Sequence, residues 1–228
     1  MIKLTIIIPV YNEIKTIEKL IKKILKINIK KQLIIVDDGS SDGTELILKK
    51  YKSRIDKLIF HKKNLGKGAA IKSGQKYVSG QYIGIQDADL EYDPSDYDKL
   101  ILPFLEADAD VVYGSRFLGG KYVRLHFFWH YVANKILTLI TNIVTNLNMT
   151  DMETGYKLFK KKTIESITLK ENSFSIEPEI TVKLAKKGYS FYEVPISYRG
   201  RSYQEGKKIT LKDAFIAIYC IIKYRFFD

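Results

Sequence analysis

Short apolar runs alternate with amphipathic segments along the first half of the chain. Apolar runs typical of buried strands occupy residues 3–10, 32–37, 57–61, 82–86 and 110–113. Ile and Leu at helical spacing predict helices between them, at 14–27, 43–51 and 95–106, and the glycine-containing stretch 64–78 predicts a loop that enters a helix. Apolar strands separated by amphipathic helices are typical of a mostly parallel sheet with helices on both faces. We therefore predict a doubly wound α/β fold, which binds ligands at the carboxyl ends of its strands.

Two amphipathic segments follow in the second half of the chain. Over residues 123–147, an apolar stripe with helical period lies opposite a polar stripe. The apolar stripe contains Trp129, Val132, Ile136, Leu139, Ile143 and Leu147, and the polar stripe contains Asn134, Thr138, Asn142 and Thr145. The apolar stripe must be covered, either by the sheet or by a membrane interface, and the sequence leaves both open. The C-terminal segment is a second membrane-surface candidate, with Lys212, Lys223 and Arg225 beside Phe215, Ile218, Ile222 and Phe226.

Composition favours a single domain with an anionic partner. The 228 residues are 46% hydrophobic and contain no internal repeat or linker, so we predict one domain over residues 1–228. The single cysteine, Cys220, excludes an internal disulfide and favours a reducing, cytoplasmic compartment. No apolar run approaches the roughly 18 residues that span a bilayer. The net charge of +12 indicates attraction to nucleic acid, an acidic membrane surface or phosphorylated small molecules.

Paired aspartates follow the second predicted strand. Asp37 and Asp38 leave the apolar run at 32–37, and Gly39 permits a tight turn behind them. A lone aspartate at this place would most simply cap the next helix, as Asp42 can do. Two acids in tandem at a strand end favour a ligand site.

A second acidic group follows the strand predicted at 82–86. Asp87 and Asp89 are separated by one residue, so in extended geometry their side chains point to the same side. They can hold one divalent cation such as Mg²⁺ or Mn²⁺. Substrate phosphates and water would complete the coordination shell of this ion. Glu91 is a third candidate ligand. The alternative is a solvent-facing strand end that caps the helix after Pro94, but the carboxylates together suggest a nearby diphosphate.

Basic residues also stand near predicted strand ends. Arg116 follows the strand at 110–113, and Arg199, Arg201, Lys207 and Lys208 lie in a glycine-containing segment after "FYEVPIS". Surface solubility would explain them, but the bidentate geometry of arginine favours a phosphate clamp. No G-x-G-x-x-G follows the first strand, and "NLGKGAA" lacks the spacing of a Walker loop, so the sequence supports neither a dinucleotide-binding fold nor an ATPase loop.

Further candidate groups occur in the second half. Asp151, Glu177 and Glu179 could act as a general base for a hydroxyl acceptor. The alternative for the two glutamates is the first turn of a helix, where acids and the intervening proline are favoured. His126 and His130 have the i, i+4 spacing of metal ligands, but no acidic third ligand accompanies them, which favours ordinary helix-surface histidines.

Seven motifs follow one another along nearly the whole chain: "IIIPVYNE", "VDDGSSDGT", "NLGKGAA", "DADLEYDP", "GSRF", "DMETGYKLF" and "EVPISYRGRSYQEGKK". In this order they resemble family 2 glycosyltransferases. "GSRF" and the C-terminal Arg-x-x-x-x-x-Lys segment are most similar to the branch that includes dolichyl-phosphate mannosyltransferases and other polyprenyl-phosphate sugar transferases. The resemblance implies a GT-A-like fold in which residues of about 1–118 bind the nucleotide sugar and about 119–228 face the acceptor and the membrane.

The resemblance also implies roles for individual residues. It implies catalytic roles for Asp89, Arg116 and Arg201, and acceptor-phosphate contacts from Arg116, Arg201 and Lys207. It implies nucleotide-sugar contacts from Pro9, Tyr11, Glu13, Asp37, Asp38, Lys67, Asp87, Ala88 and Asp89, and metal ligation by Asp87, Asp89 and Glu91. Many relatives carry Gln where Glu91 stands, so its ligand role stays open.

We expect an inverting transfer of a hexose, mannose or glucose, from a GDP- or UDP-sugar to polyprenyl phosphate. Mg²⁺ or Mn²⁺ would neutralise the departing diphosphate, and an anionic acceptor phosphate would need no protein base. We also expect peripheral attachment to an anionic membrane on its cytoplasmic face.

Transfer to a sugar hydroxyl, with Asp151 or Glu177 as the base, is the alternative within the family. A basic membrane- or nucleic-acid-binding module is disfavoured, and no nucleic-acid partner is expected, because such a module would not require Asp87 and Asp89.

Overall fold

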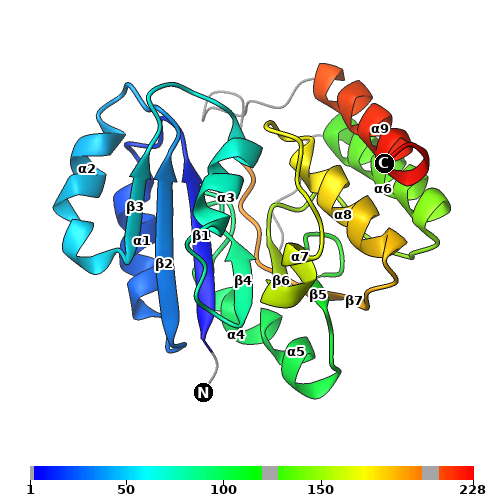
Figure 1. The fold of residues 1–228 in the computed structure, drawn as a ribbon, viewed down its shortest axis with the longest axis horizontal. Helices are drawn as coiled ribbons and strands as arrows, with labels where there is room; N and C mark the ends of the chain where they lie inside the picture. The colour runs from blue at the N-terminus through cyan, green and yellow to red at the C-terminus, as the bar shows by residue number, and fades with distance from the viewer. Residues whose placement is uncertain (1–2, 120–127, 202–210) are drawn as a thin grey trace.

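A seven-stranded sheet forms the centre of this computed structural model, which describes residues 3–119, 128–201 and 211–228 (Figure 1). The strands are β1 (Leu4–Val10), β2 (Lys31–Asp37), β3 (Lys57–Phe60), β4 (Tyr82–Ile85), β5 (Val111–Ser115), β6 (Lys157–Lys160) and β7 (Phe191–Pro195). Their order is β3-β2-β1-β4-β6-β5-β7, and only β6 runs antiparallel to its neighbours. The five strands expected in the first half are confirmed, and the last of them extends to Ser115.

Helices cover both faces of the sheet, which confirms the predicted doubly wound α/β class. One face carries α1 (Ile17–Lys26), α2 (Thr44–Lys50), α4 (Tyr97–Leu100) and α5 (Leu102–Glu106). The other carries α3 (Lys67–Gln75), α6 (Phe128–Thr145), α8 (Ile176–Lys186) and α9 (Leu211–Phe226). The short elements are η1 (Lys52–Arg54), η2 (Pro94–Asp96) and α7 (Lys161–Glu165).

The two-residue period of the strands divides the core into these two layers. In β1, Ile6 and Ile8 pack into the layer that contains α1, while Ile7 packs into the layer that contains α3. Both faces of the central strands are therefore buried, which explains their continuous apolar runs. The register sets Val10 of β1 opposite Asp37 of β2, so the carboxyl ends of these parallel strands are level.

The helix expected at 95–106 is interrupted. The 3₁₀ turn η2 leads into α4, and α5 begins separately at Leu102. Pro103 stands in the first turn of α5, where its missing N–H is tolerated. Pro103 has no N–H to donate to the carbonyl of Lys99, and its ring crowds that carbonyl, so the hydrogen-bond ladder of α4 is not continued into α5.

Helix α6 directs only part of its apolar surface toward the core: Leu137 is buried, and Ile140 and Val144 pack against the core, while much of the predicted apolar stripe is exposed. Its buried residues are Leu137, Thr138, Thr141 and Thr145. Trp129 is 76% exposed and Ile143 72% exposed, and Ile136 and Leu139 are exposed as well. The polar stripe can face the protein because Thr141 and Thr145 donate their hydroxyl protons to main-chain carbonyls one turn back. Of the two covers that the sequence left open, the sheet is therefore excluded for Trp129, Ile136, Leu139 and Ile143.

Helix α9 packs beside α6 and α8 (Figure 1). It also exposes several large apolar side chains. Its inner side contains Ala217, Cys220, Ile221 and Tyr224, which are buried at helical spacing. Phe215, Tyr219, Ile222 and Phe226 are exposed on the outer side. Across the described ranges, no helix combines the length and the apolar character needed to cross a bilayer. His126, Lys207 and Lys208 lie outside the described residues.

Candidate active site at the carboxyl edge of the sheet

The predicted acidic residues meet at the carboxyl ends of adjacent parallel strands. Asp37 ends β2 and Asp38 follows it, while Asp87 and Asp89 follow β4. Glu13 follows β1, which lies between those two strands in the sheet. Of the other predicted donor contacts, Pro9 and Tyr11 lie at the same end of β1, and Ala88 is buried between the two aspartates.

Asp38 shapes the loop that leads into α3. Its carboxylate accepts hydrogen bonds from the N–H groups of Leu65 at 3.0 Å and Gly66 at 2.7 Å, and Nδ1 of His61 lies 2.6 Å from it. Nε2 of His61 lies 2.9 Å from the hydroxyl of Ser73 on α3. These contacts hold the start of α3 against the end of β2. A direct contact of Asp38 with a nucleoside stays a prediction.

A chain of buried ion pairs begins at Asp87. Its carboxylate lies 2.7 Å from Nζ of Lys67, the first residue of α3, and the same ammonium lies 2.8 Å from Glu177 on α8. Glu177 also lies 2.7 Å from Nζ of Lys157, a fully buried lysine of β6. The charges alternate, so each buried ion has an opposite neighbour. Helices α3 and α8, which lie in the same layer, thereby fix the orientation of Asp87.

Asp89 is held from the other side by Arg201. Its carboxylate lies 2.8 Å from a terminal nitrogen of the Arg201 guanidinium, and Glu13 lies 3.1 Å from the other terminal nitrogen. Burial, and then the negative charges of Asp87 and Glu91, raise the pKa of Asp89 to about 7. A positive charge near this carboxylate is therefore favourable, since it offsets both the burial and the repulsion.

Glu91 anchors the segment that carries Arg201. It accepts a hydrogen bond from the hydroxyl of Tyr198 at 2.6 Å and from the main-chain N–H of Arg201 at 2.8 Å. The predicted set of three metal-binding carboxylates is not assembled, because within the described residues no three His, Cys, Asp or Glu side chains come close enough to hold an ion by themselves. Glu91 instead connects the acidic stretch to the chain after β7.

Asp87 and Asp89 nevertheless fit a divalent cation as a partial ligand set. Carboxylate oxygens are the donors that Mg²⁺ and Mn²⁺ prefer, and such ions commonly take one or two of them together with substrate phosphates. Burial is the largest cause of the raised pKa of Asp89, followed by the negative charges of Asp87 and Glu91, so a bound cation would stabilise the ionised carboxylate. The two aspartates would hold the ion, and the phosphates of a donor would supply further oxygens.

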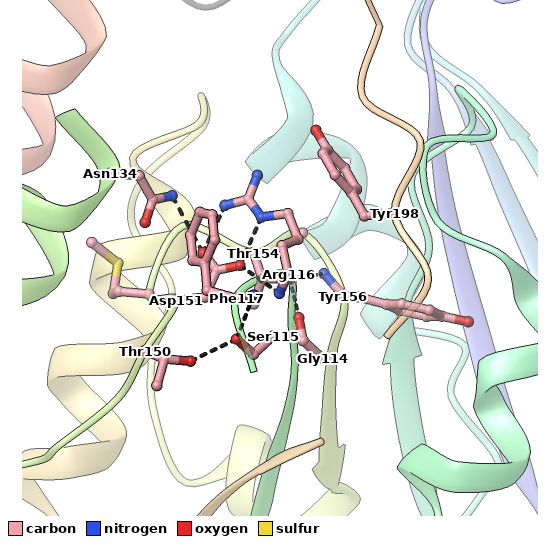
Figure 2. Close-up of polar contacts among 12 residues, drawn as sticks. Gly114, Ser115, Arg116, Phe117, Asn134, Thr150, Asp151, Thr154, Tyr156 and Tyr198 are labelled. Atoms are coloured by element: carbon pink, nitrogen blue, oxygen red, sulfur yellow. Dashed lines mark hydrogen bonds and ion pairs between the residues drawn. The ribbon is translucent and has the colours of Figure 1, made fainter. Parts of the chain in front are cut away.

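Arg116 and Asp151 form a second charged centre at the end of β5 (Figure 2). The Arg116 side chain donates from Nε and a terminal nitrogen to the two Asp151 oxygens, each at 2.7 Å, and its main-chain N–H donates to the same carboxylate. The amide of Asn134 on α6 contacts Asp151 at 3.3 Å. The Arg116 guanidinium carbon lies 5.2 Å from the ring centre of Tyr198, which supports its other side.

The three predicted general bases are all occupied. Arg116 outweighs the effect of burial and lowers the pKa of Asp151, which is fully buried. Lys157 and Lys67 likewise outweigh burial and lower the pKa of Glu177 to about 2. Glu179 accepts hydrogen bonds from the N–H groups of residues 170 and 171 and from a lysine of its own helix. The positions of Asp151 and Glu177 therefore speak against their predicted role as bases.

Sequence reasoning missed three residues of this region. Lys157 lies within an apolar strand, and a lysine in such a run is a signal for a buried ion pair. Glu153 lies between Asp151 and the glycine of the "ETG" motif, and burial raises its pKa to about 7. His61 had no signal in the sequence, because its partner Asp38 is distant along the chain.

The fold is similar to that of a solved glycosyltransferase. Glucosyl-3-phosphoglycerate synthase from Mycobacterium tuberculosis, crystallised with Mn²⁺, UDP and phosphoglyceric acid, superposes with a TM-score of 0.77 over 100% of this chain and 80% of that chain, at 17% identity. A structure of the same enzyme with Mg²⁺ and UDP gives 0.74 over 98% and 79% of the two chains. At this identity the likeness shows the fold alone, and the fold is that of GT-A glycosyltransferases.

Sequence comparison then gives the family. Residues 5–168 match the family described as glycosyl transferase family 2, and the chain belongs to that family. It is 30% identical over 220 residues to an uncharacterized protein of Methanocaldococcus jannaschii, covering 89% of this chain and 93% of that protein. It is 29% identical over 231 residues to dolichol-phosphate mannosyltransferase of Pyrococcus furiosus, covering 97% of this chain and 64% of that enzyme. The chain is therefore a glycosyltransferase, which confirms the expectation from its motifs.

The Arg116–Asp151 pair allows a direct test of its structural importance. Asp151→Ala leaves the Arg116 guanidinium largely buried without its carboxylate partner, so we expect the free energy of unfolding to fall by about 3–5 kcal/mol. Urea denaturation followed by circular dichroism measures this loss. The matched control is Asp108→Ala, which breaks the ion pair of a fully solvated aspartate with Lys160 and should cost less than about 1 kcal/mol. Equal losses in the two variants would show that the Arg116–Asp151 ion pair is no more important for stability than an exposed one.

Proposed function

We propose that the protein transfers a hexose, mannose or glucose, from a GDP- or UDP-sugar to polyprenyl phosphate with inversion at the anomeric carbon. Membership of family 2 and the similarity to a dolichol-phosphate mannosyltransferase support this proposal. The observation that carries the acceptor class is the position of Arg116. Its guanidinium is oriented by Asp151 on the inner side of α6, and the outer side of that helix is apolar and exposed. An arginine in this place suits the phosphate of a lipid.

On the donor side, the chain offers fixed charges for a diphosphate. Lys67 holds Asp87 and Arg201 holds Asp89, and both cations stand next to the proposed phosphate position. Bound at these aspartates, Mg²⁺ or Mn²⁺ supplies positive charge that stabilises the departing diphosphate. Glu13, Asp37 and Asp38, with Pro9, Tyr11 and Ala88, line the proposed nucleotide-sugar side at the ends of β1, β2 and β4.

On the acceptor side, the phosphate itself is the nucleophile. It is anionic at neutral pH, so its oxygen can attack without a protein base, provided that cations hold it in line. Arg116 is the proposed holder, with Arg201 and Lys207 as further candidates from the segment after β7. A single displacement from the face opposite the leaving diphosphate inverts the anomeric carbon.

A saccharide hydroxyl is the second candidate acceptor, because one carboxyl near Arg116 is not engaged in an ion pair with it. Burial raises the pKa of Glu153 to about 7, a value suited to taking a proton near neutral pH. Asp151 and Glu177, the bases expected earlier for this reaction, are ion-paired. If the acceptor is a hydroxyl, Glu153 is the better candidate for the base.

We further propose that the outer faces of α6 and α9 rest on an anionic bilayer, on its cytoplasmic side. The two helices pack together, and each exposes several large apolar side chains. These side chains are Phe128, Trp129, Ile136, Leu139 and Ile143 of α6 with Phe215, Ile216, Tyr219, Ile222 and Phe226 of α9. Such patches on a protein surface mark interaction sites.

Charge and position favour lipid as the occupant. Arg225 stands in the last turn of α9 next to the exposed Phe226, the chain carries a net charge of +12, and aromatic side chains favour the headgroup level of a bilayer. The inner side of α6 contacts Asp151 through Asn134, and Lys135 donates to the carbonyl of Thr150. A helix resting on lipid would therefore place Arg116 next to the membrane surface, where the phosphate of a polyprenyl chain lies.

Asp89→Ala tests the donor site. We expect the transfer of radiolabelled hexose from GDP-mannose or UDP-glucose into a lipid extract to fall by at least about a hundredfold, because the departing diphosphate loses electrostatic stabilisation. EDTA should produce a similar loss in the unchanged protein, and added Mn²⁺ should restore transfer. Asp98→Ala, which alters an exposed aspartate on α4, should keep full activity. Undiminished metal-dependent transfer by Asp89→Ala would remove this aspartate from the site, and label recovered only in saccharide would favour the second acceptor.

The membrane face can be tested with vesicles. The double variant Leu139→Glu and Ile143→Glu places two carboxylates on the exposed face of α6, and we expect it to lose binding to vesicles of phosphatidylcholine and phosphatidylglycerol in a flotation assay. Leu46→Glu, at an equally exposed leucine of α2 in the other helix layer, is the matched control and should bind normally. Equal binding by all three proteins would contradict a lipid-facing role for α6. Equal binding to vesicles without anionic lipid would contradict the electrostatic part.

A further inference from the structure

Glu153 lies midway along a loop that is anchored to the site at both ends. At one end, Asp151 holds Arg116. At the other end, Gly155 packs so closely on Asp87 that a Cβ atom there would overlap the carboxylate. Since each residue adds at most about 3.6 Å, the Cα atom of Glu153 lies within about 7 Å of the Cα atoms of both Asp151 and Gly155. Glu153 is therefore placed between the proposed diphosphate position and the proposed acceptor cation.

The carboxyl group of Glu153 differs from its neighbours in its contacts. Its Oε1 atom is buried and accepts no hydrogen bond from the residues that the structure describes. Asp151 is paired with Arg116, and Glu177 lies against both Lys67 and Lys157. Buried polar atoms nearly always have a partner, so an exception at this place calls for a specific explanation. A ligand between the two anchors would supply the missing partner.

Charged groups from four parts of the fold face Glu153. They are Lys157 of β6, Glu177 of α8, Arg116 after β5 and Asp151 of the same loop. The two cations are each paired with one of the two carboxylates, so little net positive charge is left to hold Glu153 ionised. Burial has the largest effect and raises its pKa to about 7, so the neutral acid is well populated at neutral pH.

We propose that Glu153 binds the acceptor phosphate as a neutral carboxylic acid and donates a hydrogen bond to a phosphate oxygen. This inference rests on the proposed polyprenyl-phosphate acceptor and adds a specificity residue to it. An ionised carboxylate would repel the phosphate, whereas a shared proton makes a strong, charge-assisted hydrogen bond. Arg116 then supplies the positive charge for the phosphate, and Glu153 supplies a donor that distinguishes it from a neutral headgroup.

The pH dependence of this role has a definite sign. A neutral acid contributes to acceptor binding below its pKa, and the contribution is lost as the pH rises through that value. A general base has the opposite dependence, because it acts only when ionised and its contribution is lost as the pH falls. The pH dependence of acceptor affinity and of turnover therefore distinguishes a neutral acid that binds the acceptor from an ionised general base.

The test measures the acceptor KM and kcat from about pH 6 to pH 9, with saturating donor and Mn²⁺ and with farnesyl phosphate as the acceptor probe. Glu153→Gln cannot ionise but keeps a hydrogen-bond donor, whereas Glu153→Ala has none. For the unchanged protein, we expect KM to rise by up to about tenfold per pH unit above the apparent pKa. Glu153→Gln should keep the low-pH KM and lose most of this rise. Glu153→Ala should have a KM about tenfold or more above normal even at pH 6.

Controls separate this inference from the proposed function. The second ionisation of the phosphate affects every variant alike, so the difference between the unchanged protein and Glu153→Gln isolates Glu153. Glu165→Gln, at an exposed glutamate of α7, should keep the normal pH dependence, and nucleotide binding by calorimetry confirms that each variant is folded. Identical pH dependence in the unchanged protein and Glu153→Gln, or a loss of kcat with unchanged KM, would overturn the inference. No transfer to farnesyl phosphate by the unchanged protein at any pH would instead overturn the acceptor class.

Discussion

The carboxyl edge of the sheet depends on the pairing of buried charges. Glu177 is 3% exposed, and the side chains of Asp87 and Asp89 are 22% and 14% exposed. Two like charges 4 Å apart repel by about 4 kcal/mol at an effective dielectric constant near 20. The edge is stable because Lys67 stands between Asp87 and Glu177, and Arg201 stands beside Asp89. Removing one cation would leave carboxylates without a partner, so the paired groups act as one unit.

The same pairing connects parts of the chain that are distant in sequence. Lys67 begins α3, Glu177 lies in the first turn of α8, and Lys157 belongs to β6, which runs antiparallel to both of its neighbours. Each contributes one charge to a common chain of contacts. Lys67 and Glu177 both come from the helix layer that contains α3 and α8. The donor side of the proposed site is thus rigid, which suits a reaction that depends on holding charge in a set geometry.

Helix α6 joins the proposed site to the exposed apolar surface. Its inner side carries threonines and Asn134, and it contacts the loop that holds Arg116. Its outer side carries the apolar stripe, beside the exposed side of α9. The exposed apolar side chains of α6 mark an interaction surface, because their contact with water is unfavourable. The proposed bilayer accounts for both of its faces.

The sequence by itself determined the five strands of the first half of the chain, the class of fold and the positions of the acidic pairs, whereas β6 and β7 were not predicted. Local periodicity and strand-end residues carry that information, and both Asp87 and Asp89 were predicted at the edge where they lie. Only the tertiary structure decided which charges are paired. The ion pair of Asp151 with Arg116 and that of Lys157 with Glu177 remove two predicted bases, while Glu153 has an oxygen without a partner. The physical reason is that burial and neighbouring charges set the protonation of a side chain, and these come from residues far apart in the sequence.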